Sequence, residues 1–159
     1  MRVACLGLWL FLVNSVGAAE LLPFDVGSPA RIRDELRGRP YVLAFWSVYC
    51  APCREEMPQW KRLRDAHPGL TVVLVAADDP AQRDDVRAFL ASHDLGDVRT
   101  YLFDDAFSER IRFAVDTKWR GELPRTYYFD QDHRVQSRSG KVSESLWASW
   151  LSGIPTPGR

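Results

Sequence analysis

Two continuous apolar runs, separated by a charged and periodic segment, constrain the fold of this chain more than any other feature. The runs are Tyr41–Trp46 (YVLAFW) and residues 70–76 (LTVVLVA), and the segment between them covers Ala51–Ala66. An apolar run of this length is typical of a strand buried on both faces. The intervening segment predicts a helix, which Pro58 is expected to kink. Strand, helix and strand in this order predict parallel strands and an α/β fold.

The rest of the chain extends the same pattern. We expect an extended entry, a short helix at residues 32–36, a helix at 78–93, a strand at 98–103, a helix at 106–115, strands at 125–129 and 134–138, and a closing helix that starts at 143 or 144. A polar turn at residues 130–133 makes the last two strands antiparallel, so the central sheet is mixed and flanked by helices. Trp147 and Trp150, one turn apart in the closing helix, are expected in the core.

The composition limits the size of the fold and the class of partner. The chain has 159 residues, of which 46% are hydrophobic and 26% charged, and its formal net charge is zero. This is enough apolar material for the core of one globular domain, which we place at residues 20–159. Because no excess of basic residues is available to neutralise phosphates, nucleic-acid binding is not expected.

Residues 1–19 have the layout of a secretory signal peptide. One positive charge precedes an apolar run at residues 3–13, and small residues lead to a cleavage point after Ala18 or Ala19. The run is shorter than the roughly 20 apolar residues that a membrane-spanning helix needs, so an uncleaved inner-membrane anchor is the less favoured alternative. The mature protein is therefore predicted to be periplasmic.

The three cysteines point to thiol chemistry. Cys5 would leave with the leader, so the mature protein keeps Cys50 and Cys53, separated by two residues. A disulfide that closes so short a loop gains little chain entropy, which argues against a purely structural role. Half of a zinc site would need two more ligands, and the histidines at 67, 93 and 133 are scattered and expected at the surface. Thiol-disulfide exchange remains as the favoured chemistry.

The two cysteines have different predicted surroundings. Cys50 follows a buried strand and a short loop and stands at the start of a helix, where free backbone amides and the helix dipole favour a thiolate. Cys53 lies one turn further into the helix and is expected to be shielded. We therefore assign Cys50 as the nucleophile and Cys53 as the resolving cysteine.

The segment 46–58, WSVYCAPCREEMP, resembles the active-site signature of the thioredoxin superfamily, and specifically of its exported TlpA-like and ResA-like members. The resemblance includes the prolines before and after the second cysteine. Leu123-Pro124 before the strand RTYYF is similar to the proline loop of that family, in which the proline is cis and packs opposite the cysteines. The resemblance implies a thioredoxin fold with an extra helix and strand inserted in the core.

Glu56 stands where ResA-like relatives carry an acid close to the buried cysteine. Such an acid could raise thiol pKa values or relay the proton of Cys53, and the plainer alternative is a solvated helix glutamate. Ala44 occupies the position of a buried aspartate in cytosolic thioredoxins, which leaves Glu56 as the leading carboxylate. Pro124 is the fourth residue that we assign to the catalytic site.

The expected substrate surface consists of Trp46, Tyr49 and Leu123 around the exposed sulfur, with core burial as the alternative for Trp46. Between the cysteines, Ala51 and Pro52 have side chains that cannot donate a hydrogen bond to the thiolate. Because strong oxidants of this fold stabilise their reduced form, this dipeptide favours a reductant.

The resulting hypothesis is a periplasmic reductase of disulfides in exported proteins. The family implies apocytochrome c or metal-site cysteines as substrates and a membrane electron-donor protein as partner. The redox-active disulfide is the only redox group expected, without a further cofactor or metal, in a monomer. An oxidising or isomerising enzyme is the main alternative. A peroxidase and a copper carrier of the same fold are less favoured, because Ala44 stands where peroxidases place a proline and copper carriers use a longer cysteine spacing.

Overall fold

The computed structural model describes residues 20–105 and 107–152. The predicted leader lies outside the described residues. The elements in chain order are β1 (Leu21–Phe24), α1 (Ser28–Glu35), β2 (Tyr41–Trp46), α2 (Ala51–Ala66), β3 (Thr71–Ala76), the short 3-10 helix η1 (Pro80–Gln82), α3 (Arg83–Ser92), β4 (Thr100–Phe103), α4 (Ser108–Val115), β5 (Arg125–Phe129), β6 (Val135–Ser139) and α5 (Glu144–Leu151).

One mixed sheet forms the centre of the molecule, as predicted. Its strand order is β1-β4-β3-β2-β5-β6. The first four strands in this order run parallel, with Leu43 of β2 opposite Val73 of β3. β5 is antiparallel to β2, and β6 is antiparallel to β5. β6 therefore ends the sheet, and its residues are almost all exposed.

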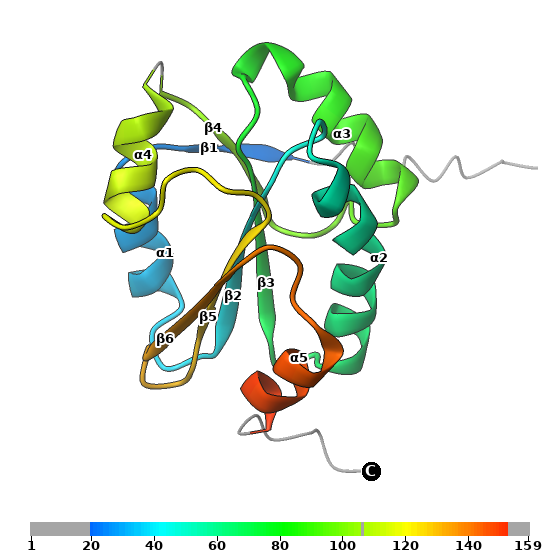
Figure 1. The fold of residues 1–159 in the computed structure, drawn as a ribbon, viewed down its shortest axis with the longest axis vertical. Helices are drawn as coiled ribbons and strands as arrows, with labels where there is room; N and C mark the ends of the chain where they lie inside the picture. The colour runs from blue at the N-terminus through cyan, green and yellow to red at the C-terminus, as the bar shows by residue number, and fades with distance from the viewer. Residues whose placement is uncertain (1–19, 106, 153–159) are drawn as a thin grey trace, which may run out of the picture.

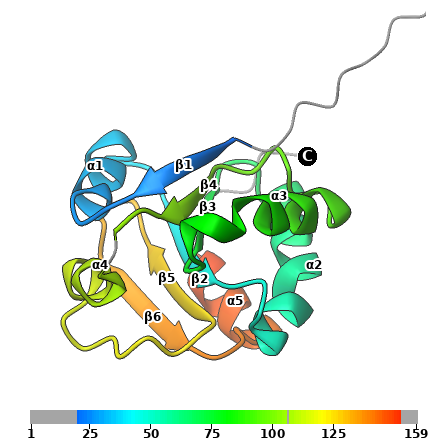
Figure 2. The same cartoon turned by 90° about the horizontal axis from the view of Figure 1, so that it is seen from above.

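Helices cover both faces of the sheet, so the molecule has three layers (Figure 1, Figure 2). α1 and α4 lie on one face, and α2, α3 and α5 lie on the other. Every residue of β2 is buried, and its side chains alternate between the two cores: Val42, Ala44 and Trp46 on one side, and Tyr41, Leu43 and Phe45 on the other. The apolar runs are thus strands buried on both faces, as their sequence predicted.

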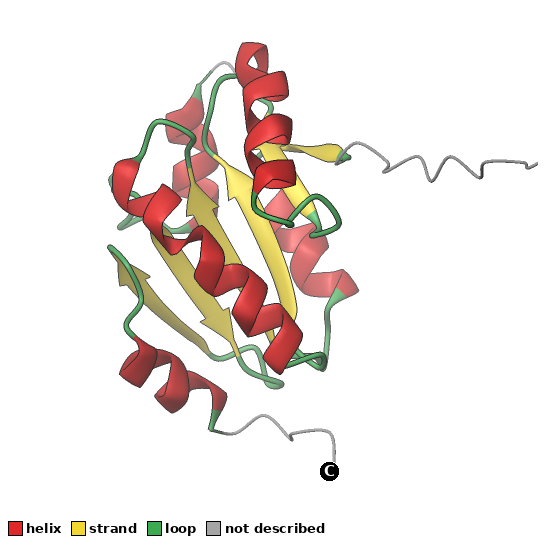
Figure 3. Ribbon diagram, turned by 90° about the vertical axis from the view of Figure 1, so that its right-hand side faces the viewer, coloured by secondary structure: helices red, strands yellow, loops and turns green. Residues whose placement is uncertain are grey.

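α2 is the helix that positions the cysteines. It runs across one face of the sheet (Figure 3). Its buried residues include Cys53, Met57 and Trp60, which follow at helical spacing. Pro52 lies in the first turn, where its missing amide costs no hydrogen bond. Pro58 lies inside the helix, which continues to Ala66. The apolar stripe of α2 therefore fixes the orientation of the first turn relative to the sheet.

Several boundaries differ from the predictions. α1 begins at Ser28 instead of residue 32, and the extended entry is strand β1, which pairs with β4. Trp147 and Trp150 are both 4% exposed, which confirms their place in the core. No helix within residues 20–105 and 107–152 is long and apolar enough to cross a membrane.

Candidate active site

Cys50 and Cys53 form a disulfide at the start of α2. The S–S distance is 2.05 Å and the Cα atoms are 5.2 Å apart. Cys50 is the N-cap residue, and its Sγ accepts a hydrogen bond from the Cys53 amide at 3.3 Å. Cys50 is half-buried, whereas Cys53 is completely buried. An approaching thiol therefore reaches Cys50 first, and the free amides of the helix start favour negative charge on its sulfur.

Asp78, which follows β3, holds the loop before Cys50 in place through hydrogen bonds. The Asp78 carboxylate accepts a hydrogen bond from the Ser47 hydroxyl at 2.7 Å and from the Val48 amide at 3.2 and 3.3 Å. Ser47 Oγ in turn accepts from the Tyr49 amide at 3.1 Å, and the Ser47 carbonyl accepts from the Cys50 amide at 3.1 Å. The position of the cysteine thus depends on a side chain from the neighbouring strand end.

Glu56 is buried, with 3% of its surface exposed. Its Oε1 accepts a hydrogen bond from the Val142 amide at 2.8 Å, and the Gln59 side-chain amide donates to the Val142 carbonyl at 3.2 Å. Burial raises the pKa of Glu56 to about 7, against the opposing effects of the Val142 amide and the Lys141 charge. Glu56 is therefore not a solvated helix glutamate. Its neighbour Glu55 is one, since it is exposed and forms an ion pair with Lys141 at 2.7 Å.

The Leu123-Pro124 peptide bond is cis, as the resemblance implied. In the antiparallel pair of β2 and β5, Phe45 lies opposite Arg125. Pro124, which directly precedes β5, is therefore at the same end of the sheet as the loop that carries Cys50. Its carbonyl accepts a hydrogen bond from the Gly140 amide at 2.8 Å.

The three residues predicted to contact the substrate differ in their exposure to solvent. Tyr49 is 68% exposed, and its hydroxyl donates to Asp85 at 3.4 Å. Leu123 is partly buried against both cores. Trp46 is 1% exposed, and its ring centroid lies 5.5 Å from that of Phe89. The core alternative therefore holds for Trp46, because its side chain points into the core that α2 and α3 form with the sheet.

A shallow groove begins at the loop next to Cys50 and continues along α3. Its lining includes Val48, Tyr49, Arg54, Ala88 and Phe89. The Arg54 guanidinium lies over the Phe89 ring at 5.7 Å, which places a cation beside an apolar floor.

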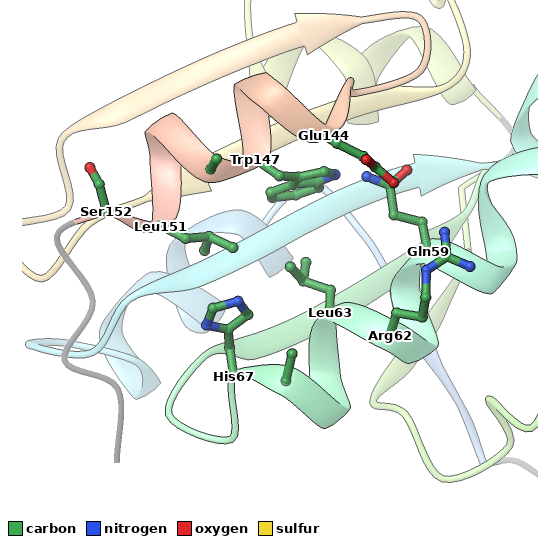
Figure 4. A pocket seen from close by; sticks show the side chains of 10 residues that line it. Gln59, Arg62, Leu63, His67, Glu144, Trp147, Leu151 and Ser152 are labelled. Carbon is green, nitrogen blue, oxygen red and sulfur yellow. The ribbon is translucent and has the colours of Figure 1, made fainter. Parts of the chain in front are cut away.

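A second groove lies between α2 and α5 (Figure 4). Leu63 of α2 faces Leu151 and Trp147 of α5 across it, with Gln59 and His67 also at the wall. Neither cysteine of the disulfide lines this groove, so we do not assign it to the redox site.

The three histidines follow α2, α3 and β5, and each is partly buried. His93 Nδ1 is 2.9 Å from the Phe89 carbonyl, and His133 Nε2 is 3.1 Å from the Leu36 carbonyl. Within the part of the chain that the structure describes, no group of three or more histidine, cysteine or acidic side chains could hold a metal ion.

Comparison with known proteins identifies the family from residues 22–138, which match the AhpC/TSA family profile. The chain belongs to the AhpC/TSA family. The thiol-disulfide oxidoreductase ResA of Bacillus cereus is 28% identical over 109 residues, which are 69% of this chain and 58% of that protein. The sporulation thiol-disulfide oxidoreductase A of Bacillus subtilis is 40% identical over 42 residues, which are 26% of each chain. The chain thus spans less than two thirds of the length of these curated relatives.

The fold of this family member also matches solved structures. A secreted Mycobacterium tuberculosis disulfide oxidoreductase, described as homologous to E. coli DsbE, superposes with a TM-score of 0.61 at 18% identity. The match covers 76% of this chain and 86% of that one. Together with the family match, this confirms the predicted thioredoxin fold. α3 and β4, which lie between β3 and α4, are the predicted extra helix and strand.

Sequence reasoning missed the part that Asp78 plays in the site. The predicted helix starts at residue 78, whereas in the structure Asp79 caps η1 and the Asp78 carboxylate bonds the loop that precedes Cys50. A usable signal was present. Asp78 follows a buried strand that is parallel to β2 and adjacent to it, so both strand ends lie at one edge of the sheet.

Proposed function

We propose that this chain is an exported thiol-disulfide oxidoreductase that reduces disulfides in other exported proteins. The observation that carries the proposal is the unequal exposure of the two sulfurs, with Cys50 accessible and Cys53 buried one turn further along α2. Exchange enzymes need this arrangement of an attacking and a resolving thiol. The names of the relatives, ResA and the sporulation oxidoreductase, support the same activity.

The proposed cycle starts from the reduced pair. The Cys50 thiolate attacks one sulfur of a substrate disulfide, forms a mixed disulfide and releases the other substrate sulfur as a thiolate. The Cys53 thiolate then attacks the Cys50 sulfur and releases the second substrate thiolate. Two electrons have passed to the substrate, and the enzyme is left with the Cys50–Cys53 disulfide seen in the structure.

Glu56 is our candidate for the group that takes the proton of Cys53. It lies three residues after Cys53 on the same buried face of α2, and its pKa of about 7 suits a proton acceptor at neutral pH. Pro124, at the start of the neighbouring strand β5, is proposed to pack opposite the cysteine pair. Tyr49 and Leu123 are proposed to contact the substrate polypeptide, with the groove beside Tyr49 receiving the chain around its disulfide.

The direction of electron flow is proposed from the dipeptide between the cysteines. Ala51 and Pro52 offer no side-chain donor to the Cys50 thiolate, so the reduced form is not specially stabilised. A reductase outside the cytoplasm needs to be recharged, and we propose a membrane electron-donor protein for this step. Apocytochrome c thiols and metal-site cysteines of exported proteins are the proposed substrates.

Trapping tests the proposal directly. Cys53→Ser protein should accumulate a mixed disulfide through Cys50 with periplasmic proteins, whereas Cys50→Ser protein should accumulate none. The trapped species are counted on non-reducing gels and identified by mass spectrometry. If Cys53→Ser captures no more than Cys50→Ser, exchange with proteins is not the function.

The reduction potential tests the direction separately. Equilibration of the wild-type pair with glutathione should give a potential well below the approximately −120 mV of the strong oxidant DsbA. A value near that of DsbA would make the chain an oxidant of exported thiols.

A further inference from the structure

Asp78 is buried against the loop that presents Cys50, yet the proposed exchange cycle does not use it. Only 4% of its surface is exposed. Through Ser47 and Val48 its carboxylate orders the backbone as far as Cys50, because the Ser47 carbonyl also receives the Cys50 amide. A buried carboxylate in this position restrains the loop, and its bond to the Val48 amide places a negative charge beside a residue two positions before Cys50.

The surroundings of Asp78 leave its charge uncompensated. The groups that face its carboxylate from the loop are donors, the Ser47 hydroxyl and the Val48 amide, and donors satisfy an ionised carboxylate. Burial raises the pKa of Asp78, the two donors oppose this, and the negative charge of Asp85 on α3 adds to it. No cation forms an ion pair with Asp78 in residues 20–105 and 107–152.

The other side of Asp78 opens to a cavity of about 510 Å³ at the carboxyl ends of β3 and β4. Asp79, Asp104 and Asp105 also line it, and Asp105 pairs with Arg110 at 3.6 Å. The cavity is large and polar enough to hold water, so Asp78 can exchange its proton with solvent. The remaining groups around it are mostly anionic and do not neutralise its charge.

We infer that Asp78 is a positioning residue of the redox site that fixes the loop presenting Cys50 and, through its negative charge, makes the cysteine pair more reducing. The inference rests on the proposed exchange function. A nearby anion disfavours the Cys50 thiolate. The reduced pair is then less stable relative to the disulfide, so its two electrons pass more readily to a substrate disulfide, which takes them up to form two thiols. Asp78 itself is neither oxidised nor reduced.

The test is to remove the charge and keep the shape. In Asp78→Asn protein, equilibration with glutathione at neutral pH should favour the reduced pair about tenfold more than in wild type, which corresponds to about 30 mV. The pKa of the Cys50 thiol, followed by the ultraviolet absorbance of its thiolate, should fall. The matched control is Asp79→Asn, which removes an exposed neighbouring charge that caps η1 instead of the loop, and it should change the equilibrium by less than about twofold.

A second charge-neutral variant, Asp78→Ser, covers the case in which Asp78→Asn does not fold. It removes the carboxylate but keeps a hydroxyl that can bond the loop, so its Cys50 pKa should fall and its equilibrium should shift toward the reduced pair, as in Asp78→Asn. The inference is overturned if the charge-neutral variants that fold have the potential and Cys50 pKa of the Asp79→Asn control. These measurements use no protein substrate, so failure of the trapping experiment would overturn the proposed function alone.

Discussion

Glu55 and Glu56 are neighbours in the sequence but have opposite environments. Successive residues of a helix point about 100° apart, so one faces solvent and the other faces the core. The hydrogen bond and the charge of Lys141 lower the pKa of Glu55, whereas burial raises the pKa of Glu56 to about 7. The same carboxyl group is therefore a surface ion-pair partner at one position and a titrating buried acid at the next.

Glu56→Gln should flatten the pH dependence of stability. The ordinary pKa of Glu56 is 4.5 and its folded value is about 7, so in this window the folded state binds more protons than the unfolded state. Wild-type stability should therefore fall as the pH rises from 4.5 to 7, by an amount on the order of 2 to 3 kcal/mol. Urea unfolding of the oxidised protein across this range measures the slope.

Glu55→Gln is the control for this experiment, because it removes an exposed carboxyl from the same helix turn. It should keep the wild-type fall in stability between pH 4.5 and 7. An unchanged slope in Glu56→Gln would mean that Glu56 does not titrate in this range.

For single residues, the sequence motifs predict the position of some functional side chains in the site and miss that of others. Glu56 and Pro124 were placed by their position in a motif, and the cis bond before Pro124 is present. Trp46 lies in the core, which is the alternative stated for it, and helices cover both faces of the strand that it ends. Asp78 was missed because its partners, Ser47 and Val48, lie about thirty residues away in the chain.

Among the elements, α4 depends on very few buried contacts. Ile111 is its one buried residue and is completely inaccessible, whereas Phe113 on the same helix is 67% exposed. Ile111 packs in the core that α1 and α4 form with the sheet, on the face opposite α2. Ile111 is therefore the main attachment of this helix, with Val115 at its end partly buried against the same core.

Ile111→Ala should lower the free energy of unfolding by roughly 3 kcal/mol, because it leaves a cavity under α4. Phe113→Ala should change it by less than about 0.5 kcal/mol, since this ring is largely in solvent. Chemical denaturation measures both. The reduction potential should stay at the wild-type value in both variants. Equal destabilisation by the two would contradict Ile111 as the main attachment of α4.

Element types were more predictable than element ends. The long apolar strands and the helix after Cys50 follow directly from hydrophobic pattern. The start of α1 does not follow from this pattern. It lies at Ser28, which is buried and donates a hydrogen bond from its hydroxyl to the Asp25 carboxylate at 3.1 Å. Local polar contacts of this kind set the ends of helices, and a serine and an aspartate in sequence alone are equally typical of a loop.

For the whole molecule, the redox state of the cysteine pair is linked to global stability. A folded protein that holds its pair at a low potential stabilises the disulfide relative to the dithiol. If the chain is a reductant, the oxidised protein should therefore resist urea better than the reduced protein. Unfolding curves measured with and without a thiol reductant give the two midpoints, and a more stable reduced form would indicate an oxidant.

The exposed outer strand β6 has a consequence for how molecules of this protein meet one another. A free strand edge is a template on which a second chain can add a strand. Here the edge strand has the sequence VQSRS, and its residues are mostly polar and in solvent. A neighbouring copy that lengthened the sheet would have to dehydrate Arg138, so concentrated solutions should resist aggregation through this edge.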